Sequence, residues 1–391
     1  MPKRGAKVKP AAYIGRSDLA VESLHVAIGG RTVGTLAMTG DGLAAFEYDA
    51  GWIEEGFALN PFSLPLRKQV FIADRHPLDG LFGVFSDSLP DGWGRLLVDR
   101  YLRSQGIDPF GISFLERLAI VGSGGMGALE YEPGLSLPVG DDGMTYDELA
   151  AECSRILRTD YSDDLDTIFA LGGSSGGARP KIFTQIDGED WIVKFPSFSD
   201  PWDIGAQEYR FSQMARSCGI AMAPTRLLPS EVHGGYFATK RFDRIGADDG
   251  AVRKIHMVSA GGLLETSHRI PNLDYGQLLR LTLMLTDDMG EVERLFRLMV
   301  FNVAIGNRDD HAKNFSFLYD EGRWRLSPAY DLTCNPGMNG EHATTVNGKG
   351  RDIAISDMLE VAKKAGLHPR KARDAVDAVM QAVGPGESCA G

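Results

Sequence analysis

The fold of this chain is decided by the stretch Gly306-Asn-Arg-Asp-Asp-His-Ala-Lys-Asn-Phe-Ser316. The residues before it, Leu295 to Ile305, are almost continuously apolar, which predicts a buried helix. That helix leads directly into residues 306–316, the polar stretch, which contains Asp309 and Asn314. We therefore interpret the rest of the sequence around these two side chains.

Asp309 and Asn314 have the spacing of a kinase catalytic loop, in which an acid is followed five residues later by an asparagine. There the acid accepts the proton of the substrate hydroxyl, and the asparagine holds a metal ion on the ATP phosphates. His311 takes a position where many kinases carry a lysine, and Asp310 adds a second acid beside the one that the spacing selects. The alternative is an ordinary polar loop, because the spacing also arises by chance.

A predicted hairpin follows the polar segment and brings a further acid back toward it. Residues 314–319 and 323–326 read as two strands around the turn Asp320-Glu-Gly322. Folding back at this turn returns the chain toward Asn314, so that Asp331 can share a metal ion with it. Two oxygen ligands together with phosphates suit Mg²⁺, which keeps several waters and uses few protein groups.

The candidate phosphate-binding loop lies upstream, in Leu171-Gly-Gly-Ser-Ser-Gly-Gly-Ala-Arg-Pro-Lys181. It carries four glycines in six residues, and glycine lets backbone N–H groups approach an anion closely. The pattern is not G-x-x-x-x-G-K-[ST], which excludes a Walker loop. A flexible turn is the alternative. The hairpin signal directly after the loop, at residues 182–186 and 191–195, favours a phosphate cradle.

Lys194 lies among apolar residues in the second strand of that hairpin. A charged amine in such a place needs an anionic partner or an edge position. The next predicted helix, residues 206–218, places Glu208 on the side of its buried stripe, so Glu208 is the expected counter-ion. A lysine–glutamate pair of this kind belongs to the active site of protein kinases. The alternative is a lysine that reaches solvent and an unrelated helix glutamate.

Composition and charge argue against several classes of function. Apolar residues make up 43 % of the chain, yet no apolar run approaches the ~18 residues of a membrane span, which predicts no membrane association. The net charge of −12 argues against direct nucleic-acid binding. No hydrophobic segment follows the basic N-terminal residues, so no signal peptide is predicted. The cysteines are far apart, from which we expect reduced thiols and a cytoplasmic location.

Three domains are expected from the order of these patterns along the chain. Residues 1–110 form a small β-rich N-terminal domain that begins with an alternating apolar pattern and a Gly29-Gly30 turn. Residues 111–245 form a β-rich lobe with the glycine-rich loop and Lys194, and residues 246–391 form a helical lobe with the polar loop. The predicted fold is therefore α+β, with two kinase-like lobes and a small additional N-terminal domain.

Together these residues resemble the HipA family of serine/threonine kinases, the toxin half of many bacterial type II toxin–antitoxin modules. The most specific match is the stretch 306–316, which is close to the family pattern G-N-x-D-x-H-A-K-N-F-S. Further matches in family order are Leu89-Pro-Asp-Gly-Trp-Gly-Arg95, Trp191-Ile-Val-Lys-Phe-Pro196, Arg241-Phe-Asp-Arg244 and Pro328-Ala-Tyr-Asp331. The resemblance covers nearly the whole chain, and it implies a two-lobed fold with ATP and Mg²⁺ bound between the lobes.

The resemblance also implies roles for single residues. Asp309 would be the catalytic base, Asn314 and Asp331 the Mg²⁺ ligands, and Ser174 or the adjacent Ser175 the site of an inhibitory autophosphorylation. Glu208 stays the ion-pair partner. The residues expected to contact ATP are Ser175, Gly176, Gly177, Ala178, Arg179, Pro180, Lys181, Lys194, Lys240, Arg241, Phe242, His311, Lys313, Asn314, Tyr330 and Asp331.

A protein substrate and a separately encoded DNA-binding antitoxin are the partners that the resemblance implies. Arg179 in the loop and Asp310, where the family usually has glycine, are departures that indicate a divergent branch. Two alternatives remain: a kinase for a lipid or small molecule, and a catalytically weak scaffold that binds the antitoxin. The intact set of Lys194, Asp309, Asn314 and Asp331 argues against the scaffold.

Overall fold

The computed structural model describes residues 19–134, 143–158, 164–246 and 251–384. Its first part is a five-stranded antiparallel sheet in the order β4-β3-β2-β1-β5. The hairpin predicted around Gly29 and Gly30 is confirmed, and both glycines have the positive φ that a two-residue turn requires. The strands of this sheet are β1 (Ser23–Ile28), β2 (Arg31–Met38), β3 (Ala44–Tyr48), β4 (Val70–Ile72) and β5 (Glu130–Glu132).

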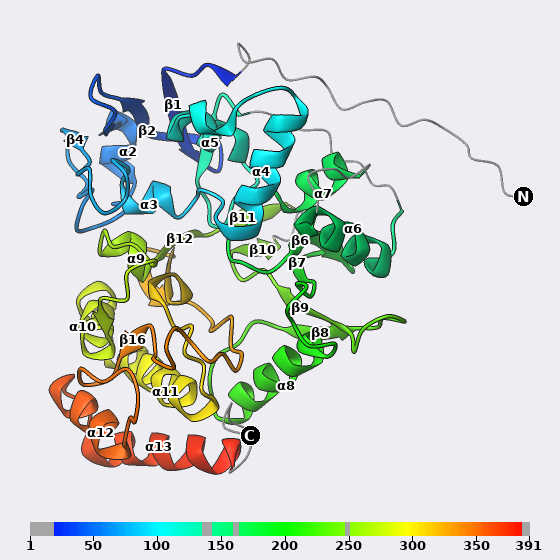
Figure 1. Cartoon of the computed structure of the whole chain (residues 1–391). Helices are drawn as coiled ribbons and strands as arrows, with labels where there is room; N and C mark the ends of the chain where they lie inside the picture. The colour runs from blue at the N-terminus through cyan, green and yellow to red at the C-terminus, as the bar shows by residue number, and fades with distance from the viewer. Residues whose placement is uncertain (1–18, 135–142, 159–163, 247–250, 385–391) are drawn as a thin grey trace, which may run out of the picture.

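Helices pack beside this first sheet, and Figure 1 shows them in blue and cyan at the top of the molecule. They are α2 (Ala50–Glu55), α3 (Gly83–Ser86), α4 (Gly92–Ser104) and α5 (Phe114–Val121). The motif Leu89–Arg95 leads into α4, which buries Leu97 and Tyr101 on one face. Because β5 pairs with β1, the sheet that opens the chain is completed by residues beyond the expected boundary at 110.

A second, four-stranded antiparallel sheet carries the glycine-rich loop at its start. Its order is β6-β7-β9-β8, and β6 with β7 forms the predicted hairpin, whose turn residues Asp187 and Gly188 both have positive φ. The strands are β6 (Lys181–Ile186), β7 (Glu189–Lys194), β8 (Thr225–Leu228) and β9 (Tyr236–Lys240). The helices of this part are α6 (Tyr146–Arg158), α7 (Leu165–Gly172) and α8 (Ile204–Ser217).

The C-terminal part is mainly helical and centres on α11 (Met289–Ile305), the buried helix predicted before the polar stretch. The second predicted hairpin is β14 (Ser316–Asp320) with β15 (Arg323–Leu326), and β12 (His256–Ser259) pairs with β14 on its other side. The remaining elements are β10 (Arg244–Gly246), β11 (Val252–Lys254), α9 (Ala260–Leu263), β13 (Leu273–Asp274), α10 (Tyr275–Thr286), β16 (Thr344–Thr345), α12 (Ile355–Lys364) and α13 (Pro369–Val383).

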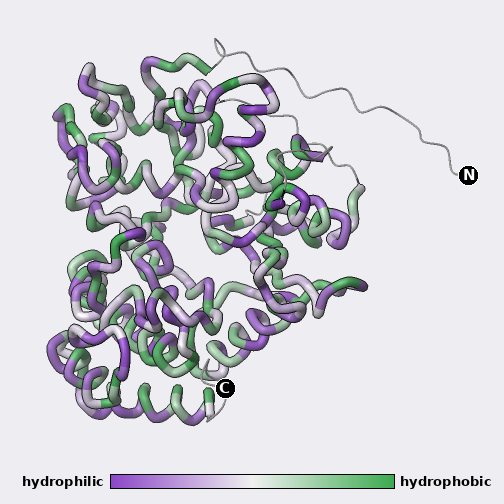
Figure 2. The backbone as a smooth tube through the Cα atoms, viewed as in Figure 1, coloured by the Kyte–Doolittle hydropathy of each residue, from purple (hydrophilic) through white to green (hydrophobic). Residues whose placement is uncertain are grey.

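Two hydrophobic clusters hold these parts together. The larger runs from the first sheet through α8, α10 and α11 to α13, and the smaller joins α4 to α6, α7 and the four-stranded sheet. In Figure 2, α13 alternates between hydrophilic and hydrophobic residues along its length, as expected of a helix with one face on the core. The helix α4 thus belongs to the first part by sequence but packs into the core of the second.

Two further features of the structure concern membrane-spanning helices and the state of the cysteines. In the part of the chain that the structure describes, no helix is both long enough and apolar enough to cross a bilayer. Cys153 and Cys218 are free and buried, as expected. Cys334 is disulfide-bonded, so the expectation of reduced thiols is wrong for this residue.

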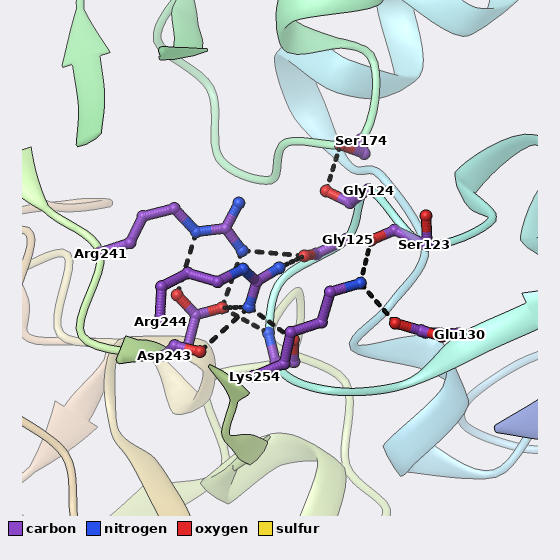
Figure 3. A network of polar contacts seen from close by, with 10 residues as sticks. Ser123, Gly124, Gly125, Glu130, Ser174, Arg241, Asp243, Arg244 and Lys254 are labelled. Carbon is purple, nitrogen blue, oxygen red and sulfur yellow. Dashed lines mark hydrogen bonds and ion pairs between the residues drawn. The ribbon is translucent and has the colours of Figure 1, made fainter. Parts of the chain in front are cut away.

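A buried charge network fastens the segment after β9 to the loop before β5 (Figure 3). The Asp243 carboxylate is fully buried and accepts hydrogen bonds from Arg241 and Arg244, at 2.8 Å each, and from the Gly127 backbone N–H at 2.7 Å. Both guanidinium groups also donate to the Gly125 carbonyl, each at 2.9 Å. The segment between the two kinase-like lobes is therefore fixed by contacts with the N-terminal part.

We expect Asp243→Asn to lower the free energy of unfolding by about 3–5 kcal/mol, because the substitution leaves two buried guanidinium groups without their anion. Urea denaturation measures this loss. The matched control is Asp187→Asn, whose partner Arg226 is largely exposed and which should change stability by less than about 1 kcal/mol. Equal effects of the two substitutions would show that the network contributes no more than a surface pair.

Candidate active site

Lys194 is the charged centre of the candidate site. Its side chain is only 11 % exposed, and its Nζ lies 2.5 Å from Glu208 Oε1, which is the contact expected from the sequence. The same ammonium also donates to Asp331 Oδ1, so one lysine joins β7, α8 and the segment after β15. Although burial disfavours the charged amine, Asp331 and Glu208 together raise the pKa of Lys194. The lysine is therefore held as a cation at neutral pH.

A second lysine faces the first across the hairpin. Lys181 of β6 pairs in register with Lys194 of β7, and Lys181 is buried. Like charges directly opposite one another destabilise a sheet unless an anion lies beside them. Asp331 supplies such an anion: although burial opposes its charge, Lys194 and Lys181 hold the pKa of its carboxyl well below the usual range. Burial lowers the pKa of Lys181, so this amine is poised to gain an anionic ligand.

The glycine-rich loop closes over Lys181. Gly177 has φ +86°, a backbone conformation that favours glycine, and a Cβ built there would lie 2.6 Å from Lys181 Nζ. Arg179, at the end of the loop, lies 3.2 Å from Asp200 and 3.7 Å from Glu208, which ties the loop to the beginning of α8. The glycine-rich loop therefore lies beside the two lysines, and its role as a phosphate cradle stays a prediction.

The two loop serines differ in access. Ser174 is half-buried, and its Oγ donates to the Gly124 carbonyl at 2.9 Å (Figure 3). Ser175 is fully buried, and its Oγ donates to the Gly172 carbonyl at 2.5 Å. A hydroxyl that accepts a phosphoryl group must reach solvent or an active site, so Ser174 is the accessible one in this conformation.

The two adjacent acids of the polar stretch have separate environments. Asp310 is fully buried, where its Oδ2 accepts from Tyr275 at 2.8 Å and lies 2.9 Å from His342 Nδ1. Asp309 is exposed, and Asn314 Nδ2 donates to its backbone carbonyl at 2.6 Å. Partial desolvation by the surrounding protein raises the pKa of Asp309, and the charges of Asp331 and Asp310 act in the same direction. Asp310 therefore stabilises the fold, and Asp309 is the acid that is accessible from solvent.

Lys313 and His311 are held by contacts that the sequence did not reveal. His311 Nδ1 accepts from the Lys313 backbone N–H at 3.2 Å, which caps the 3₁₀ turn Ala312–Asn314. Lys313 Nζ lies 2.8 Å from Asp91 Oδ2, and Asp91 Oδ1 accepts from the backbone N–H of Gly177. Asp91 was noticed only as part of a matching motif. No sequence signal gives it these two partners, which come from segments far along the chain.

The segment 240–242, whose residues are expected to contact ATP, is brought to the site in part. The ring centroids of Phe242 and Tyr330 are 5.8 Å apart, which places this segment next to Asp331. Lys240 instead pairs with Glu189 at 2.5 Å. The side chain of Arg241 is 6 % exposed and pairs with Asp243, and its backbone N–H donates to the Asp190 carbonyl at 2.8 Å, so in this conformation neither group is available to a ligand.

The chain matches two family models. Residues 173–385 match the HipA-like C-terminal domain, and residues 24–132 match the HipA N-terminal domain. Two curated relatives from Sinorhizobium fredii (strain NBRC 101917 / NGR234) are named "Putative kinase Y4dM" and "Putative kinase Y4mE". The first is 28 % identical over 89 % of this chain and 87 % of its own length, and the second 27 % identical over 93 % and 92 %. A kinase-type function follows from these matches.

A solved structure shares the fold. One chain from the Shewanella oneidensis MR-1 complex of HipA, HipB and operator DNA superposes with a TM-score of 0.70 at 17 % identity. The superposition covers 92 % of this chain and 88 % of that one. The predicted α+β fold with two kinase-like lobes and a β-rich N-terminal domain is thereby confirmed.

The depressed pKa of Asp331 predicts how stability depends on pH. A carboxylate whose pKa is lowered by folding stabilises the protein above its unfolded value of 3.8, and this stabilisation is lost as the pH falls through the folded value. Wild type should therefore exceed Asp331→Asn in unfolding free energy near pH 7, and the difference should shrink below pH 3.8. Denaturant titrations at several pH values test this. A difference that stays constant with pH would contradict the charge pairing.

Proposed function

This chain belongs to the HipA family, and on that premise we propose that it is an ATP- and Mg²⁺-dependent serine/threonine protein kinase that transfers the γ-phosphoryl group to a protein hydroxyl. The observation that carries the proposal is the pair of facing lysines, Lys181 and Lys194, beside Asp331 and under a glycine-rich loop. Two buried ammonium groups with one shared carboxylate form a site for a polyanion such as a nucleotide phosphate chain.

The residues present fit a nucleotide with its metal ion. The donor set of Asn314 and Asp331 consists of an amide oxygen and a carboxylate oxygen, which are the ligands that Mg²⁺ prefers. The amide nitrogen of Asn314 is engaged by the Asp309 carbonyl, so its Oδ1 is the atom left for a metal. Bound Mg²⁺ would neutralise charge on the phosphates. Loop residues 175–181 with Lys194, His311 and Lys313 would hold the phosphates, and residues 240–242 with Tyr330 the base.

Asp309 is proposed as the general base. Its carboxylate is the exposed one of the two acids, while the buried Asp310 is occupied by Tyr275 and His342. The raised pKa of Asp309 strengthens it as a proton acceptor for a substrate hydroxyl. The orientation of this loop is fixed by two hydrogen bonds. Asn314 donates to the Asp309 carbonyl, and the Asp310 carboxylate accepts from the backbone N–H of Thr344.

Ser174 is proposed as a site of inhibitory autophosphorylation, because it is the less buried of the two serines in the glycine-rich loop. A phosphate there would add about −2 charge to a loop that is meant to receive phosphate. The fully buried Ser175 would need the loop to rearrange before it could react.

A separate DNA-binding antitoxin is the proposed partner, and the cytoplasm the proposed location. The structural neighbour was solved with HipB and operator DNA, and the net charge of −12 here favours contact with DNA through a basic partner. A kinase for a lipid or small molecule and a catalytically weak antitoxin-binding scaffold are the alternatives. No contact in the described residues favours either of them over a protein kinase.

Asp309→Asn should lower phosphotransfer by about 10² or more while nucleotide affinity changes little, because the base is lost and the cradle is kept. Wild type and variant are incubated with γ-labelled ATP and Mg²⁺, and the labelled residues are mapped by mass spectrometry. Label on Ser174 in the wild type only is the expected result. Near-wild-type turnover of the variant would overturn the assignment of the base.

Asp331→Asn should make nucleotide binding less dependent on Mg²⁺, because one of two proposed oxygen ligands is replaced by an amide. Calorimetric titrations of ATP with and without Mg²⁺ measure this dependence in both proteins. Asp187→Asn, on the exposed turn of the β6–β7 hairpin, serves as the control. An unchanged metal dependence would exclude Asp331 as a ligand.

A further inference from the structure

The beginning of α4 is built against the glycine-rich loop. The Trp93 backbone N–H donates to the Gly177 carbonyl at 2.9 Å, and its indole Nε1 donates to the Lys181 carbonyl at 3.1 Å. A Cβ on Gly94 would lie 2.0 Å from the Ser175 carbonyl oxygen, and one on Gly92 would lie 2.4 Å from that of Gly177. Two glycines therefore allow a backbone-to-backbone approach, and the loop is supported from the N-terminal domain.

Asp91 stands at the N-cap of α4 but does not cap its own helix with its side chain. An aspartate at this position ordinarily accepts from the N–H groups of its own first turn. Here Oδ1 accepts from the Gly177 N–H in the glycine-rich loop, and Oδ2 lies 2.8 Å from Lys313 Nζ in the polar stretch. One carboxylate thus links two segments that the proposed function places on either side of the nucleotide phosphates. Although burial opposes its ionisation, Lys313 and these hydrogen bonds lower the pKa of Asp91 to about 2.

The same stretch of chain is also anchored on the C-terminal lobe. Asp87, just before α4, accepts from the backbone N–H of Ser259 at 2.7 Å and from its hydroxyl at 2.9 Å. Gly262 packs so closely that a Cβ there would lie 2.4 Å from Asp87 Oδ2. The stretch 86–95 therefore has one end on the C-terminal lobe and the other on the glycine-rich loop.

We propose that residues 86–95 form a strut that fixes the glycine-rich loop relative to the polar stretch, and that Asp91 is the positioning residue of this strut. The Gly177 N–H points toward Asp91, whereas a Cβ on Gly177 would face Lys181 Nζ, so the carboxylate and Lys181 approach this residue from different directions. In the proposed role Asp91 holds Gly177 and Lys313 in the arrangement that receives phosphate. This role rests on the proposed function.

The matched pair of variants is Asp91→Asn and Asp99→Asn, because both acids lie on or at α4 with similar exposure, 18 % and 22 %. Asp99 pairs with Arg117 inside the N-terminal domain and touches neither loop. Asparagine keeps the volume of Asp91 and is itself a favoured N-cap residue, so α4 should be retained. Far-UV circular dichroism spectra that match the wild-type spectrum in both variants check this.

Hydrogen exchange followed by mass spectrometry on the full chain reads the loop directly, without any kinase assay. Peptides covering residues 173–181 should exchange about tenfold faster or more in Asp91→Asn, because a charge-assisted hydrogen bond is lost, and should be unchanged in Asp99→Asn. Unchanged exchange in Asp91→Asn would overturn the strut.

Calorimetric titration with ATP and Mg²⁺ is the second experiment, and it measures the affinity for the nucleotide. We expect affinity to fall about tenfold in Asp91→Asn and to stay at the wild-type value in Asp99→Asn. Tighter binding by Asp91→Asn would overturn the positioning role, since it would make Asp91 a competitor of the phosphates. If the wild type binds no ATP but the loop is loosened in Asp91→Asn, the strut stands and the proposed function fails.

Discussion

The buried ammonium of Lys194 is the constraint on which the rest of this structure depends. A charge that is 11 % exposed is tolerable only with partners, and its two partners come from α8 and from the segment after β15. Loss of either would leave an uncompensated charge inside the protein, so the lysine requires both lobes to stay in register. Lys181, directly opposite on β6, increases this demand, because Asp331 must balance two cations.

Local features of the fold could be read from the sequence because their causes are local. Asp187, Gly188 and Gly322 adopt the positive φ that their residue types favour, and the two hairpins form around them. The Lys194–Glu208 contact was predictable for a similar reason: a charged residue in an apolar strand needs an acid, and the next helix offered one on its buried side. Such predictions use only neighbouring residues and elementary energetics.

Contacts between distant segments could not be predicted in this way. Asp309 and Asp310 are the same residue type at adjacent positions, and only Tyr275 and His342, far away in the sequence, make one of them structural. Asp91 resembles an ordinary helix cap, and its partners Gly177 and Lys313 are defined by the packing of α4 on another domain. Arg241 was expected to contact the nucleotide, yet its side chain forms an ion pair with the buried Asp243, two residues later. In each case the deciding partner is set by topology.

The charge pairing also bears on how the proposed kinase would use its ligands. Two amines in the site already have carboxylate partners: Lys194 has Glu208 and Asp331, and Lys313 has Asp91, whereas Lys181 lies near the charges of Asp331 and Glu208. These pairs avoid the cost of isolated buried charges before any phosphate enters the site. As a proposed ligand of Mg²⁺, Asp331 would hold the metal ion with the same carboxylate that pairs with Lys194, and Mg²⁺ would supply further positive charge for the phosphates. A single acid of the segment after β15 would therefore connect the lysine of one lobe to the metal site of the other.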